Sequence, residues 1–193
     1  MRWHLCMMVS ITCVTVCNAQ QATPQPPYAD IVLDYARPFT IQDGGSTSKA
    51  YLFNVGCDIY NYRGNSPIGL VLGARMGFLK NDGTYVRQAS QQIWGTKLQA
   101  AFVAGARIYR MAGKRVLEAG IVAGPVHLAN IEIGSFDKPL TSILSEASVY
   151  ISPFVGVYIG AKFIYYPVFY DYKLQPIGGS ALSAIGLSMR VAI

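Results

Sequence analysis

The sequence has few charged residues. Asp, Glu, Lys and Arg together make up 13% of the 193 residues, against about 25% in soluble proteins. Apolar residues make up 52%, yet after the N-terminal segment no run reaches the ~18 apolar residues that a membrane-spanning helix needs. Helical spans are therefore excluded. For so apolar a chain, a closed β-barrel remains the main structure in which all backbone N–H and C=O groups are hydrogen-bonded within lipid.

Cysteine is also scarce, and three of the four cysteines lie in the N-terminal segment. Arg2, the apolar run Leu5–Cys17 and the small or polar residues before Gln20 predict a cleavable signal peptide over residues 1–19. Its removal leaves Cys57 alone, so an intrachain disulfide is impossible. We interpret Cys57 as a small hydrophobic residue on a strand face.

Two alternatives to cleavage stay open for this N-terminal segment. A transmembrane anchor is disfavoured because the apolar run is shorter than a spanning helix requires. Lipid attachment at Cys17 is disfavoured because Val16, and not a small residue, precedes it.

Alternation between apolar and other residues is the strongest positive signal, and it is clearest in residues 67–80. Every second position is apolar from Ile68 to Phe78, while glycines and Arg75 occupy most of the positions between. A period of two predicts a β-strand. The strand is longer than the usual 5–6 residues of soluble proteins and is suited to crossing a bilayer at a tilt.

The same parity rule holds for eight segments of the chain. It predicts strands at residues 28–37, 49–62, 67–80, 94–110, 115–124, 141–151, 154–166 and 180–193. The connections alternate between long (38–48, 81–93, 125–140 and 167–179) and short (63–66, 111–114 and 152–153). This alternation is typical of outer-membrane barrels with periplasmic termini and four long extracellular loops.

We therefore predict an all-β fold, an eight-stranded antiparallel up-and-down transmembrane β-barrel over residues 28–193. A short flexible leader, rich in Pro and Gln, precedes it at residues 20–27. The sequence gives no sign of a second domain. The predicted location is the bacterial outer membrane.

The composition of the less apolar strand face indicates which of the two faces points into the barrel. In a secreted barrel of the lipocalin kind this face would meet water and carry many polar side chains, but here it is rich in glycine, which weakens a solvent-exposed strand. We therefore place this face in a narrow lumen. Ten charged residues, five of each sign, share the face and are predicted to form a lumen charge network: Asp30, Asp34, Asp58, Arg75, Lys97, Arg107, Glu118, Glu146, Lys162 and Arg190.

Buried charges persist when they are paired, so we interpret this network as a plug. Reflection about a turn at Ala112–Gly113 places Arg107 directly opposite Glu118. Reflection about Ser152–Pro153 places Lys162 diagonal to Glu146. An ion-conducting path lined by both signs is the alternative.

Outward-facing aromatic residues near the loop ends of the strands predict an interfacial girdle. Its members are Tyr35, Tyr51, Phe53, Phe78, Trp94 and Tyr165. At the turn ends the aromatic residues have inward parity instead, namely Tyr60, Tyr109, Tyr150 and Tyr158. A second girdle is therefore weak, and these tyrosines are expected to fill the lumen.

The basic surplus of the chain lies in the short turns, at Arg63, Arg110, Lys114 and Arg115, while the long loops are nearly balanced. Nucleic-acid binding is therefore not predicted, and neither is a basic extracellular patch for anionic lipid.

The stretch Asn54–Lys80, with the turn from Arg63 through Asn65-Ser66-Pro67 to Gly69, resembles the second hairpin of the small outer-membrane proteins of the OmpX/Ail kind and, more loosely, of the OmpW kind. The C-terminal strand resembles the signal that the outer-membrane assembly machinery reads, with Leu187, Met189, Val191 and Ile193 as its outward residues. It departs from that pattern because Ile193 stands where an aromatic residue is usual. The resemblance implies an eight-stranded barrel in contact with outer-membrane lipid.

Some barrels of this size are lipid-modifying enzymes, but no catalytic residues are predicted here. His127, the one histidine after the signal peptide, is expected at the mouth of the third long loop. Barrel deacylases place a serine two residues after such a histidine, and here that residue is Ala129. A catalytic Ser/His pair formed by residues of separate strands remains an alternative. One histidine and one cysteine cannot form a metal site, so no cofactor or metal is predicted.

Two functions fit these features. The first is a binding, adhesion or structural barrel whose loops contact a host or environmental ligand through apolar loop residues, among them Phe169 and Tyr172. The second is an OmpW-like conduit for small hydrophobic molecules, which the apolar upper lumen at Leu52, Leu79 and Leu182 favours.

Overall fold

The computed structural model describes residues 29–39, 50–62, 66–81, 95–112, 115–131, 139–177 and 181–193. The predicted signal peptide, the leader, Trp94 and most of the long loops lie outside these residues. Within them no helix is long and apolar enough to cross a membrane. The described residues form ten strands: β1 (Ala29–Phe39), β2 (Tyr51–Tyr62), β3 (Ile68–Asn81), β4 (Gly95–Ala112), β5 (Arg115–Asn130), β6 (Leu140–Phe154), β7 (Val157–Tyr166), β8 (Phe169–Tyr170), β9 (Pro176–Ile177) and β10 (Leu182–Ala192).

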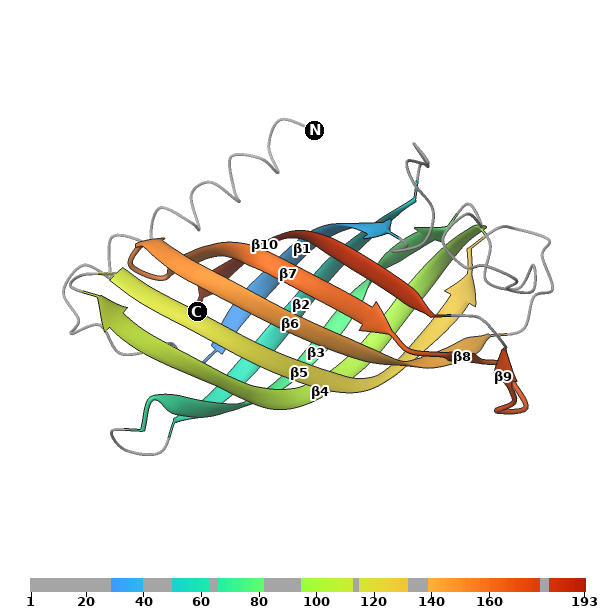
Figure 1. Ribbon diagram of the computed structural model, residues 1–193, viewed down its shortest axis with the longest axis horizontal. Helices are drawn as coiled ribbons and strands as arrows, with labels where there is room; N and C mark the ends of the chain where they lie inside the picture. The colour runs from blue at the N-terminus through green and yellow to red at the C-terminus, as the bar shows by residue number, and fades with distance from the viewer. Residues whose placement is uncertain are drawn as a thin grey trace.

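Eight of the strands close into a barrel (Figure 1). Each long strand pairs antiparallel with the next, and β10 pairs with both β7 and β1, which joins the ends of the sheet. The predicted fold class, an eight-stranded antiparallel up-and-down transmembrane barrel, is confirmed. We call the end with the three short connections, on the left in Figure 1, the turn end, and the opposite end the loop end.

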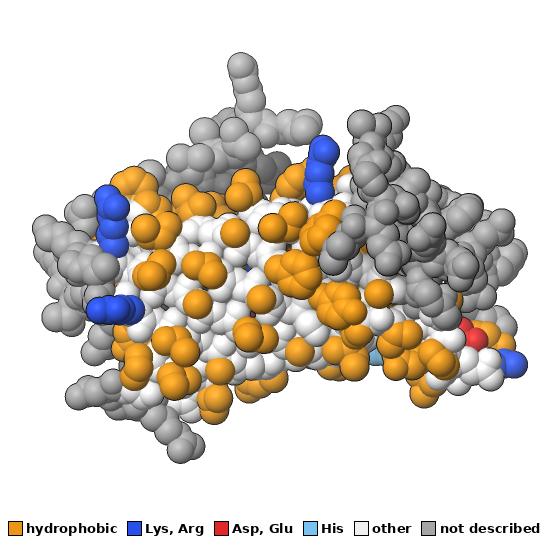
Figure 2. All heavy atoms as spheres, in the orientation of Figure 1, with side chains coloured by type: hydrophobic (Ala, Val, Ile, Leu, Met, Phe, Trp, Pro, Cys, Tyr) orange, Lys and Arg blue, Asp and Glu red, His pale blue; other side chains and the backbone are white. Residues whose placement is uncertain are grey.

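The outer wall of the barrel is apolar, and Figure 2 shows hydrophobic side chains spread along its visible length, a region that we call the hydrophobic belt. Alternate residues of each strand point outward, so that Leu72 is 66% exposed and Leu187 is 69% exposed. The residues between them point inward and are buried. This is the orientation of a barrel that faces lipid, and it contradicts the lipocalin alternative, in which the apolar face would be internal.

Strand β5 is six residues longer than the sequence analysis predicts. It continues through Pro125 to Asn130, although proline lacks the N–H that a ladder needs. The pairing with β4 is interrupted there, between Ala101↔Val126 and Ala104↔Ala123, while Pro125 stays aligned with Ile143 on β6. The proline therefore costs ladder bonds on one side only. The prediction that residues 125–140 form a loop was wrong for residues 125–130 and for Leu140, while residues 132–138 lie outside the described part of the chain.

The turn between β6 and β7 also differs from the prediction. Strand β6 continues past Ser152 and Pro153 to Phe154, with an irregularity between Ile151 and Phe154. Gly156 then takes a φ of 78°, a conformation that glycine adopts without strain. The turn therefore lies at residues 155–156, two or three residues later than expected.

The fourth long connection contains a small hairpin, β8–β9, whose first strand pairs with β6. Phe169 was expected to be available for protein contact, but this was wrong. Its side chain is fully buried and stacks on Tyr166 with the ring centroids 5.6 Å apart. Tyr172, at the tip of the hairpin, is exposed as expected.

Candidate functional site

All ten predicted members of the lumen charge network lie inside the barrel. Each is at most 2% exposed, and together they come from all eight long strands. The burial follows from strand parity, since each of these residues alternates with outward-facing neighbours. Nine of the ten take part in ion pairs with one another, as the next paragraphs describe.

Arg75 on β3 makes the central connection across the lumen. Its Nη1 lies 2.5 Å from Asp58 Oδ1 on the neighbouring strand β2. On the far side of the barrel its Nη2 lies 3.1 Å from Glu146 Oε2 on β6. One guanidinium thus joins opposite walls, through the forked geometry that suits arginine to two carboxylates.

Lys162 on β7 extends the network toward β1. Its Nζ lies 2.7 Å from Asp34 Oδ2 and 3.1 Å from Glu146 Oε2. Asp34 also accepts a hydrogen bond of 2.5 Å from Ser188 on β10. Glu146 is therefore shared between two cations, Arg75 and Lys162.

Two further arginines, Arg107 on β4 and Arg190 on β10, pair with carboxylates near the turn end. Arg107 lies 2.5 Å from Asp58 Oδ2 and 3.3 Å from Glu118 Oε1. Arg190 lies 2.9 Å from Asp30 Oδ2 and 2.8 Å from Glu118 Oε2. These two arginines and three carboxylates complete a chain of ion pairs that runs around the interior.

The inward tyrosines of the turn end pack against these arginines. The guanidinium of Arg190 lies 4.0 Å from the ring centre of Tyr150 and 4.7 Å from that of Tyr158. The guanidinium of Arg107 lies 4.9 Å from the ring centre of Tyr60, whose hydroxyl donates to Asp30 at 2.7 Å. The sequence analysis expected these tyrosines only to fill space. The structure gives them cation–π contacts, and their matching inward parity was the available signal.

One of the two predicted pairings was wrong in register. Arg107 lies opposite Gly120, and Glu118 lies opposite Tyr109, because Ala112 pairs with Arg115 and the hairpin turns one residue later than assumed. The side chains of Arg107 and Glu118 still meet diagonally. The other pairing is correct, since Lys162 lies opposite Ser148 and is diagonal to Glu146.

Lys97 lies apart from the other nine charges, close to the loop end. Its Nζ donates to Asn130 Oδ1 at 2.7 Å. Nearby, Gln99 donates to Asn54 and accepts from the hydroxyl of Tyr166 at 2.8 Å. The sequence analysis did not single out this layer of neutral polar groups.

The loop-end half of the lumen is mainly apolar and is packed with side chains. Leu52, Leu79 and Leu182, the predicted upper lumen residues, are buried there. Leu128, Leu140, Leu144, Ile164, Tyr166 and Phe169 belong to the same cluster. The interior is thus divided into a part toward the turn end that holds nine of the ten charges and a mainly apolar part toward the loop end, whose polar exceptions are Lys97, Gln99 and Asn54.

Missing side chains make room for the charged part. A Cβ at Gly73 would overlap Asp58 Oδ1, and a Cβ at Gly120 would overlap the side chain of Arg107. Large charged residues fit inside an eight-stranded barrel because glycines face them, as the sequence analysis inferred from the glycine-rich face.

The predicted girdle residues lie outward near the loop end. Tyr35, Tyr51, Phe53 and Phe78 are exposed, and Tyr165 is half-buried beside Phe163. Tyr35, Phe53 and Phe78 share one row, because each pairs with the next across β1, β2 and β3. In the predicted assembly signal Leu187, Met189 and Ile193 are exposed and Val191 is half-buried.

The residues considered for other chemistry lie on the outer wall. His127 belongs to β5 and not to the mouth of a loop, and it faces outward between Ala100 and Thr141. Cys57 is an exposed free thiol on β2. Within the described residues no three His, Cys, Asp or Glu side chains group as metal ligands.

Comparison with known proteins identifies the fold. No family model and no curated protein matches the sequence. The outer-membrane enzyme PagL matches with a TM-score of 0.56 and 10% identity, over 85% of this chain and 99% of that one. Ail of Yersinia pestis (TM-score 0.47, 15% identity, covering 86% and 99%) and Neisserial surface protein A (0.46, 15%, 86% and 94%) also match.

The chain therefore has the fold of the small eight-stranded outer-membrane β-barrels, as the sequence resemblance implied. At these identities the likeness concerns the fold alone.

Proposed function

We propose that the protein is an outer-membrane barrel with a closed lumen, which acts through its surfaces as a binding or structural barrel and not as a pore. The cross-lumen bridge from Asp58 through Arg75 to Glu146 carries this proposal, because it joins opposite walls inside the barrel. The packed apolar cluster above it supports the same conclusion.

Planar-bilayer recordings of the purified protein test the plug. We expect no steady single-channel conductance at either polarity. The triple variant Arg75→Ala, Arg107→Ala and Glu146→Ala, checked for folding by its heat-modifiable migration, is expected to leak ions and so shows that the assay detects an opened lumen. A reproducible open level from the unaltered protein overturns the proposal.

Location and orientation follow from the same proposal, with both termini periplasmic and the loop end extracellular. Unboiled and boiled samples should migrate differently on gels, and protease added to intact cells should cut only in the loops. A soluble, heat-insensitive and fully cleaved protein contradicts the outer-membrane location.

The apolar loop-end cluster favours a second candidate, a conduit that takes up small hydrophobic molecules. Deletion of residues 131–139 separates the two candidates. Loss of ligand or cell binding with unchanged permeability supports the binding barrel. Reduced uptake of a hydrophobic fluorescent probe with unchanged binding supports the conduit.

We propose no catalytic role for the outward-facing His127. Its ladder neighbours are Ala100 and Thr141, and Ala129 follows on the same face. The variant His127→Gln should fold normally. We expect both the parent protein and this variant to leave phospholipid and lipid A in the surrounding membrane chemically unchanged. Deacylated lipid that appears with the parent and disappears with the variant would identify an enzyme.

A further inference from the structure

In the described strands, the charged side chains that face outward all carry a positive charge. In the described strands the outward-facing charged residues are Arg37 and Lys80 near the loop end and Arg110 and Arg115 at the turn end. Every carboxylate of these strands faces inward. Basic side chains are visible near the borders of the hydrophobic belt in Figure 2.

Arg110 and Arg115 form a pair on neighbouring strands. Arg110 lies opposite Leu117, and Arg115 lies opposite Ala112, so the two arginines are diagonal neighbours on the outer face. Their Cβ atoms are therefore about 7–8 Å apart. Within the described part of the chain no carboxylate pairs with either one. Two adjacent like charges repel unless an anion lies between them.

Among the turn-end residues whose side chains the structure describes, no Tyr or Trp faces outward, although these residues usually mark the edge of a membrane belt. Tyr60, Tyr150 and Tyr158 lie at this end, but their rings are inside the barrel. On the outer face, Arg110 is the next outward residue after Ile108 toward the turn end, and Arg115 is the next one after Leu117. The arginine pair thus lies at the turn-end edge of the apolar wall.

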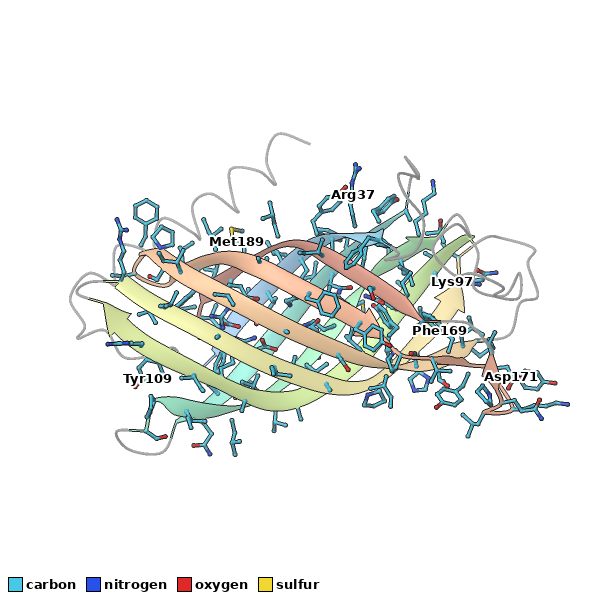
Figure 3. All side chains as sticks on the ribbon, viewed as in Figure 1. Arg37, Lys97, Tyr109, Phe169, Asp171 and Met189 are labelled. Atoms are coloured by element: carbon cyan, nitrogen blue, oxygen red, sulfur yellow. The ribbon has the colours of Figure 1, made fainter. Side chains whose placement is uncertain are left out.

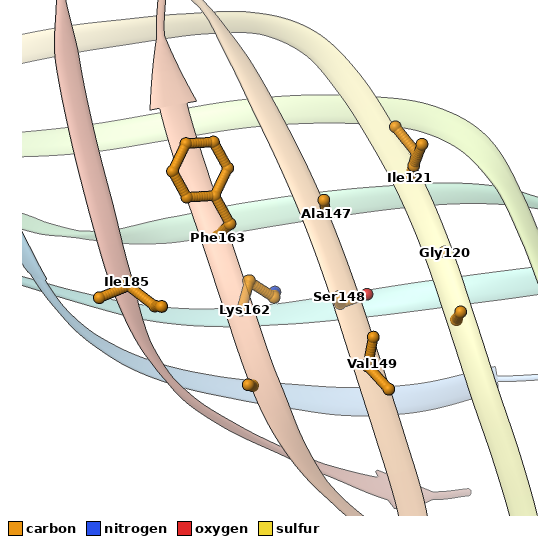
Figure 4. A pocket seen from close by; sticks show the side chains of 10 residues that line it. Gly120, Ile121, Ala147, Ser148, Val149, Lys162, Phe163 and Ile185 are labelled. Carbon is orange, nitrogen blue, oxygen red and sulfur yellow. The ribbon is translucent and has the colours of Figure 1, made fainter.

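The outer wall has a depression across β5, β6 and β7, which Figure 4 shows from close by. Its first lining residue on β5 is Ala119, four residues after Arg115. It has a volume of about 400 Å³. The small side chains of Ala119, Ala147 and Ala161 form its floor, and Ile121, Val149 and Phe163 rise around it. Lys162 and Ser148 belong to the same stretch of wall, but their side chains are buried on the inner side.

We propose that this part of the wall binds one anionic glycerophospholipid of the leaflet at the turn end. The guanidinium groups of Arg110 and Arg115 hold the phosphate of its headgroup, and one acyl chain lies in the alanine-floored depression. Arginine suits this role because its planar fork donates two hydrogen bonds to phosphate oxygens.

The spacing fits a phospholipid. Ala119 is four residues from Arg115, or roughly 13 Å along the strand, which corresponds to roughly 10 Å of depth for a strand tilted by about 40°. One leaflet of hydrocarbon is roughly 15 Å thick, half of the ~30 Å core. A chain whose headgroup lies at the arginine pair therefore passes over the depression within the same leaflet.

Native mass spectrometry of the full-length processed protein tests the proposal. The protein is released from mixed micelles that contain equal amounts of phosphatidylglycerol and phosphatidylcholine with the same acyl chains. We expect one retained phosphatidylglycerol in preference to phosphatidylcholine. Each arginine is expected to contribute about fivefold to the preference, so Arg110→Gln reduces it about fivefold and Arg110→Gln with Arg115→Gln abolishes it.

Matched variants separate the two parts of the site. Lys80→Gln with Lys173→Gln removes the same number of charges elsewhere and should leave the preference unchanged. Ala147→Leu fills the depression and should shorten retention of the lipid, whereas Ala100→Leu on the outward face of β4 should not. Both alanines face outward, so either variant is expected to fold.

Three outcomes overturn the proposal. The first is an unchanged lipid preference in the double arginine variant. The second is displacement of the bound lipid by millimolar inorganic phosphate, which would make the site one for a free anion. The third is equal retention in Ala147→Leu and Ala100→Leu, which would show that the depression holds no chain.

Discussion

Replacement of Arg75 by methionine should destabilise the barrel by about 3 kcal/mol. The change removes one guanidinium from the middle of the lumen while it keeps an unbranched side chain about as long as the aliphatic part of arginine. Arg75 donates to Asp58 at 2.5 and 3.1 Å and to Glu146 at 3.1 and 3.3 Å. Without it both carboxylates remain buried with one partner fewer.

The magnitude follows from what each carboxylate keeps. Removal of one partner from a buried ion pair costs about 3–5 kcal/mol when the other is left uncompensated. Here Asp58 retains Arg107 at 2.5 Å and Glu146 retains Lys162 at 3.1 Å. The expected loss is therefore at the lower end of that range. The double variant Arg75→Met with Glu146→Gln should lose less free energy of unfolding than the sum of the losses in the two single variants. The reason is that Glu146→Gln removes one of the carboxylate charges that Arg75→Met leaves with one partner fewer.

Urea unfolding in lipid, followed by heat-modifiable migration and tryptophan fluorescence, measures the change in the free energy of unfolding. Lys80→Met on the same strand is the matched control, since Lys80 lies outward and half-buried at the loop end, and it should change stability by about 0.5 kcal/mol or less. A loss below about 1 kcal/mol for Arg75→Met, or strict additivity with Glu146→Gln, would show that the bridge does not hold the walls together.

Three other predictions test the orientation and packing of the barrel. Leu72→Arg, on the exposed wall, should destabilise the protein in lipid by about 2–4 kcal/mol, and an effect below about 0.5 kcal/mol would mean that Leu72 does not meet hydrocarbon. A spin label at Cys57 in nanodiscs should be relaxed more by oxygen than by a water-soluble nickel chelate, with the opposite order for Lys173→Cys in a Cys57→Ser background. Gly73→Ala should lose about 1–3 kcal/mol through overlap with Asp58, while the outward Ala74→Val should be neutral, and equal losses would contradict the tight packing of the inner face.

The fold and its orientation could be predicted from the sequence because both depend on parity alone. A period of two assigns each side chain to one face, and the glycine-rich face is identifiable as the crowded one. For this reason the sequence predicts the ten interior charges, including Arg75 and Lys162, and all ten lie inside the barrel.

The partners of these charges could not be predicted beyond neighbouring strands. Contacts across the lumen, such as Arg75 with Glu146 from β6, depend on strand tilt and stagger, which a single sequence does not specify. The register within a hairpin depends on the position of its turn. Because the β4–β5 turn lies one residue later than predicted, Arg107 is paired with Gly120 and not with Glu118. Pro125 misled the prediction of β5 because proline usually ends a central strand, whereas here the β4–β5 ladder is interrupted around it.

The inward parity of the turn-end tyrosines links the interior to the outer wall. Inside the barrel, Tyr60, Tyr150 and Tyr158 cover the faces of Arg107 and Arg190, and this allows two guanidinium groups to be buried close together. The same parity removes these rings from the membrane border, where tyrosine would otherwise anchor the wall. An anchor at that border must then come from another residue type, and Arg110 and Arg115 are the described charged residues that face outward there. The aromatic packing of the plug and the cationic edge of the belt are thus two consequences of one sequence pattern.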